Sequence, residues 1–172
     1  MDSIMQLNVR PAAEEDLKAL SLILNEIIVI GGSTALEKKL STHEFKSDFI
    51  AGPHCLCCFV AEDEKGIILG FQSLSVHKDL PHSWADIATF VCITHKTRGV
   101  GSRLFQDTIK FARRSKIECI NATIRADNPS GLGYYSKMGF EDYSVEKGVP
   151  LLDGTLVDSI SKKYSWEQSF KL

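Results

Sequence analysis

The sequence lacks the features that mark membrane, secreted and nucleic-acid-binding proteins. Its apolar patch at 27–30 is far too short to cross a bilayer. Its start holds no apolar signal segment and soon reaches an acidic stretch at 14–16. Its formal net charge of −2 argues against a general nucleic-acid binder, which needs a broad basic face. We therefore expect a soluble cytoplasmic protein that binds neither membrane nor nucleic acid.

The sequence also lacks an even set of cysteines, because it has five. Cys55, Cys57 and Cys58 lie beside His54, which suggests half of a metal site, but no second pair of ligands follows. We interpret all five cysteines as buried strand residues, because a free thiol packs like a small apolar side chain. An unpaired set also suits a reducing compartment, and no metal is predicted.

No repeat, low-complexity tract or Pro/Ser linker interrupts the 172 residues. Apolar runs predict strands at 7–10, 55–61, 67–76, 84–93, 118–125, 140–145 and 157–164. Helical spacing and helix-end residues predict helices at 17–30, 44–50, 101–114 and 129–138. The order βααβββαβαββ implies an α/β (α+β) fold, in one domain over residues 1–172, with helices packed on a central sheet.

A glycine-containing turn, Lys-Thr-Arg-Gly-Val-Gly-Ser-Arg at 96–103, joins a predicted strand to a predicted helix. Glycines let the backbone approach a ligand, and a helix start offers unpaired N–H groups and a positive dipole to phosphate. Arg98 and Arg103 add positive charge, and Arg103 is the best single candidate for an anion contact. The turn is neither a Walker loop nor a dinucleotide fingerprint, because the Gly-Lys-Ser/Thr ending and the third glycine are absent. Alone, it is equally compatible with a tight turn that binds nothing.

A second motif lies at 128–140, and together with the turn it resembles the GNAT superfamily of acetyl-CoA-dependent N-acetyltransferases. The family's Arg/Gln-x-x-Gly-x-Gly/Ala turn corresponds to 96–101, with Lys96 at the first position. Its Asn-x-x-Ala-x-x-x-Tyr-x-x-x-Gly-Phe motif corresponds to 128–140, with Gly131 in place of alanine. The segments 9–12 and 34–37 are similar to the branch that contains phosphinothricin acetyltransferase. The resemblance implies a GNAT-like mixed central β-sheet, flanked by helices on both faces.

The resemblance also implies where acetyl-CoA, as the cosubstrate, would lie. Its pantetheine arm would run between two splayed parallel strands, along the backbone of Phe90 and Val91 and near Asn128. Tyr135 would point at the sulfur, whereas its neighbour Tyr134 is expected to face elsewhere and to serve packing. Backbone N–H groups of the turn would hold the pyrophosphate; these residues are Arg98, Gly99, Val100, Gly101, Ser102 and Arg103.

Attack of an amine on a thioester needs a base for the amine and a proton for the departing thiolate. Tyr135 suits the second role, because its ordinary pKa of ~10 lies only about 1.5 units above that of a thiol. Asp86 is the candidate base, acting through water, where the related branch carries a Glu; His77 and His82 are alternatives. An acyl-enzyme at Cys92 is disfavoured, because no His or Asp is placed by the sequence to activate the thiol.

The sequence therefore predicts an N-acetyltransferase that acts on a primary amine of a small molecule or amino acid. Two alternatives stay open: acetylation of a protein N-terminus or lysine, and an acyl-CoA-binding sensor without turnover. Retained Tyr135 argues against the sensor. We expect the segment 31–37, the second helix and the turn 148–157 to select the acceptor. A homodimer through the C-terminal strands is compatible with this fold.

Overall fold

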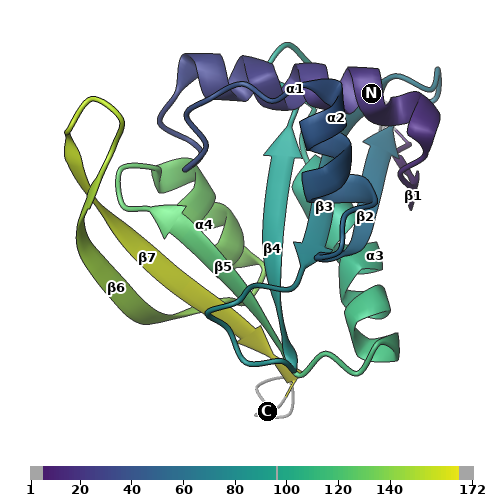
Figure 1. Ribbon diagram of the computed structural model, residues 1–172. Coiled ribbons are helices and arrows are strands. Elements are labelled where there is room, and N and C mark those ends of the chain that lie inside the picture. Colours follow the sequence, from purple (N-terminus) through teal and green to yellow (C-terminus); the bar gives the residue numbers. More distant parts are fainter. Residues whose placement is uncertain (1–5, 96, 167–172) are drawn as a thin grey trace.

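The computed structural model describes residues 6–95 and 97–166, and Figure 1 shows its arrangement. The predicted order βααβββαβαββ is confirmed. None of the helices in the described ranges is long and apolar enough to cross a membrane. In chain order the elements are β1 (Asn8–Pro11), η1 (Glu14–Asp16), α1 (Leu17–Ile30), α2 (Thr42–Phe45), η2 (Lys46–Ile50), β2 (Cys55–Glu62), β3 (Ile68–Ser75), β4 (Trp84–Val91), α3 (Val100–Arg114), β5 (Cys119–Arg125), α4 (Pro129–Lys137), β6 (Glu141–Pro150) and β7 (Leu156–Ser165).

Seven strands form one mixed sheet in the order β1-β2-β3-β4-β5-β7-β6. The pair β4–β5 is parallel, and the other neighbouring pairs are antiparallel. Parallel neighbours need a crossover connection, which α3 supplies between β4 and β5. This crossover puts the predicted glycine turn directly after β4.

Helices cover both faces of the sheet, as predicted (Figure 1). On one face, α1 and α2 bury Leu20, Leu24 and Phe45 against Phe71 of β3. On the other face, α3 buries Leu104 against Leu69 of β3. The α4 helix packs on β5 in a further apolar cluster with the second half of the sheet.

Two predicted elements differ in extent. The second helical segment begins at Thr42 because Ser41 and Glu44 form a capping box, with Ser41 Oγ accepting from Glu44 N at 3.1 Å. The strand predicted at 140–145 continues to Pro150 as β6, at the edge of the sheet. Its charged and glycine-containing second half carries no apolar alternation, because most of its residues are exposed.

The five cysteines are unpaired thiols. Cys58, Cys92 and Cys119 are buried as predicted, whereas Cys55 and Cys57 are only half-buried. Burial raises the pKa of Cys57 to about 12, which disfavours its thiolate at neutral pH. Within 6–95 and 97–166, no group of three or more His, Cys, Asp or Glu side chains is placed to hold a metal ion.

Candidate functional site

The strands β4 and β5 pair only over their first three residues in the described structure. Trp84, Ala85 and Asp86 face 119–121 in parallel register, whereas pairing of β4 with β3 continues to Val91. The segment 87–91 therefore has a strand neighbour on one side only. This is the predicted splay between two parallel strands.

Val91 directs its backbone toward this splay. Cys92 N donates to Leu69 O at 2.8 Å, and residues of an antiparallel ladder alternate in the side to which they bond. Phe90 and Cys92 therefore bond to β3, while Val91 turns its N–H and C=O to the side where β5 has diverged. The ring of Phe90 also packs in the core against Phe71. Of the two residues predicted to bind pantetheine through their backbone, only Val91 is oriented for it.

The glycine turn starts α3 one residue earlier than predicted. Gly99 is the N-cap with φ 83°, a left-handed conformation that glycine adopts without strain, and α3 begins at Val100. The N–H groups of Val100, Gly101 and Ser102 lie in the first turn, where no intrahelical acceptor exists. A Cβ on Gly99 would meet nothing within 4 Å, so the space above the turn is open. Lys96, the first residue of the motif, lies outside the described residues.

The two arginines of the turn differ in what they contact. Arg103, the predicted anion ligand, forms an ion pair with Asp107 one helical turn away. Arg98 is exposed and makes no ion pair or hydrogen bond with the part of the chain that the structure describes. The positive charge of Arg98 is therefore the more available of the two.

Tyr134 serves packing as predicted, but the prediction that it faces away from the surroundings of Tyr135 is wrong. Its hydroxyl donates to Gly101 O at 2.8 Å, so α4 contacts the first turn of α3. A Cβ on Gly101 would lie 2.7 Å from Cε2 of the Tyr134 ring. Burial raises the pKa of Tyr134 to about 12, so the hydroxyl stays protonated. Gly101 is therefore needed for close packing of Tyr134, whatever binds at the turn.

Gly101→Ala is expected to lower the free energy of unfolding by about 1–2 kcal/mol, because the added methyl overpacks a fixed ring. Gly133→Ala is the matched control: it lies in α4, and its Cβ would meet nothing within 4 Å. There the gain in helix propensity should stabilise the protein by about 0.5–1 kcal/mol. Urea unfolding of both variants measures the difference. Equal stabilisation by both would refute the close contact between Gly101 and Tyr134.

Tyr135 reaches the splay from α4, on the same side of the sheet as α3. Its side chain is buried, its ring packs edge to face on Tyr134 and Phe140, and its hydroxyl lies 2.9 Å from Thr89 Oγ1. Burial raises the pKa of Tyr135 well above its usual value, and the hydrogen bond with Thr89 opposes this. Tyr135 is thus a protonated phenol beside the unpaired segment of β4.

Asp86 lies at the point where β4 and β5 separate. Its half-buried carboxylate accepts a hydrogen bond from Asn121 Nδ2 at 2.7 Å, and Tyr143 donates to Asn121 Oδ1. Burial raises the pKa of Asp86, while the Asn121 contact and the charge of His77 lower it. Asp86 also lies near enough to Tyr135 for its charge to raise that residue's pKa. The sequence prediction missed Asn121 and Tyr143, because only the pairing of distant strands brings them to Asp86.

Asn128 caps α4, with Oδ1 accepting from Gly131 N at 3.0 Å. Its Nδ2 donates to Ser33 O at 3.3 Å, so both ends of the amide bind the protein. A Cβ at position 131 would lie 2.5 Å from Asn128 Nδ2, which explains why glycine replaces alanine in this motif. A pantetheine contact by Asn128 would have to replace the bond to Ser33.

The segment 31–40 is tied to the far half of the sheet. Arg125 donates to Thr34 O, and Leu152 N donates to Glu37 Oε2 at 2.9 Å. Within the segment, Leu40 exchanges two hydrogen bonds with the side chain of Asn25 on α1. Two of the three segments expected to select the acceptor, 31–37 and 148–157, are therefore in contact.

Cys92 has a histidine partner that the sequence prediction did not anticipate. Its Sγ lies 3.2 Å from Thr94 Oγ1 and 3.7 Å from His95 Nδ1. Burial raises the pKa of the Cys92 thiol, but the contacts with Thr94 and His95 outweigh it, so the pKa lies below the ordinary value. Cys92 packs with Phe90 under α1, on the face opposite Thr89 and Tyr135. The thiol therefore lies on the other side of the sheet from the proposed proton donor.

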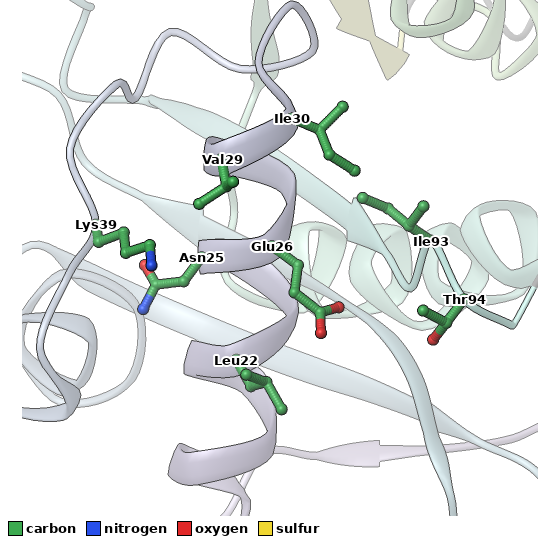
Figure 2. A pocket seen from close by; sticks show the side chains of 8 residues that line it. All are labelled: Leu22, Asn25, Glu26, Val29, Ile30, Lys39, Ile93 and Thr94. Atoms are coloured by element: carbon green, nitrogen blue, oxygen red, sulfur yellow. The ribbon is translucent and has the colours of Figure 1, made fainter.

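A groove of about 380 Å³ runs along the outward face of α1 (Figure 2). Exposed apolar side chains of α1 at helical spacing form its floor, and the carboxylate of Glu26 lies on the side of Ile93 and Thr94 (Figure 2). The groove contains none of the predicted site residues and lies beside the segment that leads from β4 to the glycine turn. Its lining residues are Leu22, Asn25, Glu26, Val29, Ile30, Lys39, Ile93 and Thr94.

Several known proteins are similar to this chain in sequence or in fold. The model of the acetyltransferase (GNAT) family matches residues 29–140. YwnH of Bacillus subtilis (strain 168), named provisionally as a phosphinothricin acetyltransferase, is 25% identical over 154 residues, 88% of this chain and 94% of its own. A GNAT superfamily phosphinothricin acetyltransferase from Sinorhizobium meliloti, solved in complex with acetyl-CoA, has a TM-score of 0.82 at 20% identity, over 94% of this chain and 89% of its own. An N-acetyltransferase from Staphylococcus aureus Mu50 has a TM-score of 0.81 at 22% identity, over 93% and 98%.

Proposed function

Because the chain belongs to the acetyltransferase (GNAT) family and is therefore an acyltransferase, we propose that it transfers acetyl from acetyl-CoA to a primary amine of a small molecule or amino acid. The observation that carries the proposal is the splay after Asp86, which Tyr135 borders. The glycine turn follows the same strand, so a single extended cosubstrate can reach both places.

Each part of the splay supplies one requirement of the reaction. The N–H of Val91 is oriented to bind the pantetheine arm or the thioester oxygen, where a backbone donor stabilises developing negative charge. The N–H groups of Gly99 to Ser102 and the charge of Arg98 suit the pyrophosphate. Asp86, with its pKa raised by burial, accepts the proton of the amine through water, and Tyr135 gives a proton to the thiolate.

The amine reacts directly with the thioester in this scheme. The Cys92 thiol contacts His95, and it lies on the opposite face of the sheet from Tyr135. The scheme needs no acyl-enzyme, and no step of it uses Cys92. Phosphinothricin acetyltransferase names among the relatives support a small amine as the acceptor.

Calorimetry with acetyl-CoA and a thiol-release assay with a panel of amines test the proposal together. We expect a dissociation constant in the micromolar range and release of free CoA thiol with at least one small primary amine, with mass spectrometry identifying the acetylated product. Binding without release on any amine or peptide would favour the acyl-CoA sensor. Release only with peptides would favour the protein acetyltransferase, and absence of binding would refute acetyl-CoA as the donor.

A further inference from the structure

We propose that Gln72 and Thr89 are positioning residues that aim the hydroxyl hydrogen of Tyr135 at the leaving sulfur. The inference rests on the proposed function, because it concerns how Tyr135 delivers its proton. It goes further by assigning a role to a fully buried polar side chain of β3, Gln72, which is 0% exposed.

Four side chains form a continuous hydrogen-bonded chain beneath the splay. Gln72 Nε2 lies 2.9 Å from Thr89 Oγ1 and 3.0 Å from Tyr134 Oη. Thr89 Oγ1 lies 2.9 Å from Tyr135 Oη, and Tyr134 Oη lies 2.8 Å from Gly101 O. The chain links the proposed proton donor to the start of α3.

The chemistry of these groups fixes the direction of three of the four bonds. An amide nitrogen only donates, so the hydroxyl oxygens of Thr89 and Tyr134 both accept from Gln72. A carbonyl oxygen only accepts, so the Tyr134 hydrogen is used on Gly101 O. In the fourth bond, between Thr89 and Tyr135, either hydroxyl could donate. We assign Thr89 as the donor, which leaves the hydrogen of Tyr135 for the sulfur.

The opposite orientation of the Gln72 amide is disfavoured. It would set the amide oxygen against Tyr134 Oη, whose hydrogen is already held by Gly101 O, so two acceptors would face each other. In the orientation present, Gln72 Oε1 is a buried atom without a hydrogen-bond partner in the described structure. Such an atom costs free energy that an apolar residue would avoid, so packing alone does not account for Gln72.

The hydrogen bond from Thr89 makes Tyr135 a stronger acid while the thiolate departs. Burial disfavours a phenolate, and a hydrogen bond donated by Thr89 stabilises it. As the N–C bond forms and the C–S bond breaks, the Tyr135 O–H proton moves to sulfur. The amine proton goes through water to Asp86. Asp86 then releases it to solvent while solvent returns one proton to the Tyr135 phenolate, so both residues recover their starting states and no proton is gained or lost.

Thr89→Val tests the proposal, because valine keeps the shape of threonine and removes the hydroxyl. We expect kcat to fall about 10- to 100-fold with the KM for acetyl-CoA within twofold, whereas Thr89→Ser stays within threefold of the wild type. Gln72→Met, which removes both donors, should lower kcat in the same direction.

A double-mutant cycle with Tyr135→Phe distinguishes positioning from a merely structural effect. In the Tyr135→Phe background, Thr89→Val should cause no further loss of kcat, because the hydroxyl that it serves is gone. An equal loss in both backgrounds, or full activity of both Thr89→Val and Gln72→Met, would overturn the inference and leave the proposed function intact. Full activity of Tyr135→Phe would remove Tyr135 from the proposed function and the inference with it.

Discussion

Ser102→Glu is expected to weaken acetyl-CoA binding about 100-fold or more while the protein stays folded. Ser102 is the third residue of α3, and its half-buried side chain borders the first turn. A carboxylate about 4 Å from a phosphate costs about 4 kcal/mol at a protein surface, which exceeds what 100-fold requires. The same carboxylate favours the helix itself, because negative charge near an N-terminus is stabilising by about 0.3–1 kcal/mol.

Gln106→Glu is the matched control for this substitution. It makes the same change of charge on the same helix, but about 6 Å further from the N-terminus and at an exposed position. Calorimetry should show less than a tenfold loss for Gln106→Glu, and the loss in Ser102→Glu should shrink at high salt. Unaltered affinity in Ser102→Glu, with a melting temperature at or above that of the wild type, would place the pyrophosphate elsewhere.

A substitution at Ser102 tests pyrophosphate binding at the turn better than a substitution at Gly101, the second glycine of the motif. Any side chain at Gly101 would collide with the Tyr134 ring, so a loss of binding there would mix electrostatics with displaced packing. The motif identified the turn, but the reason for its second glycine is a contact with α4, thirty-three residues later in the chain. The local sequence pattern predicts that the backbone at Gly101 lies close to another group. Only the tertiary structure shows that this group is the Tyr134 ring.

The same limit explains which parts of the site the sequence predicted. Local signals were sufficient for helix ends, because α1 ends before Gly31 with φ 75° and α4 ends before Gly139 with φ 99°, and glycine adopts a positive φ without strain. They were also sufficient for the strand order along the chain. Gln72 carried no signal, because a polar residue in an apolar run is indistinguishable from any strand residue until its partners are known.

The Asp86 site shows a second kind of limit, in which the residue is predicted but its electrostatics are not. Its position on a strand before the turn was visible, whereas its burial and its bond to Asn121 depend on parallel pairing with β5. That pairing decides whether the carboxylate is an ordinary acid or one with a raised pKa. The activity and the stability of the protein should therefore both respond to this one group.

Asp86→Asn is expected to lower kcat/KM about 100-fold or more and to leave acetyl-CoA binding within twofold. Asparagine cannot take a proton from the amine, and general base catalysis contributes about 10²–10⁴-fold. Its side-chain oxygen can still accept from Asn121, so the local packing is kept. Glu64→Gln, which removes an exposed carboxylate in the turn between β2 and β3, is the control and should leave the rate unchanged.

The sign of the pH effect follows from the raised pKa of Asp86. The folded protein holds this proton more tightly than the unfolded chain, so the contribution of Asp86 to stability is greatest below the unfolded pKa of ~3.9. This contribution is lost as pH rises through the folded pKa.

Asp86→Asn should therefore be at least as stable as the wild type at pH 7, and this advantage in stability should disappear in acid. The kcat/KM of the wild type should rise with pH over the same window. Urea unfolding and initial rates between pH 4 and pH 8 measure both. Retained activity in Asp86→Asn would transfer the role of base to His77, whereas lost stability at pH 7 would show that the carboxylate supports the fold.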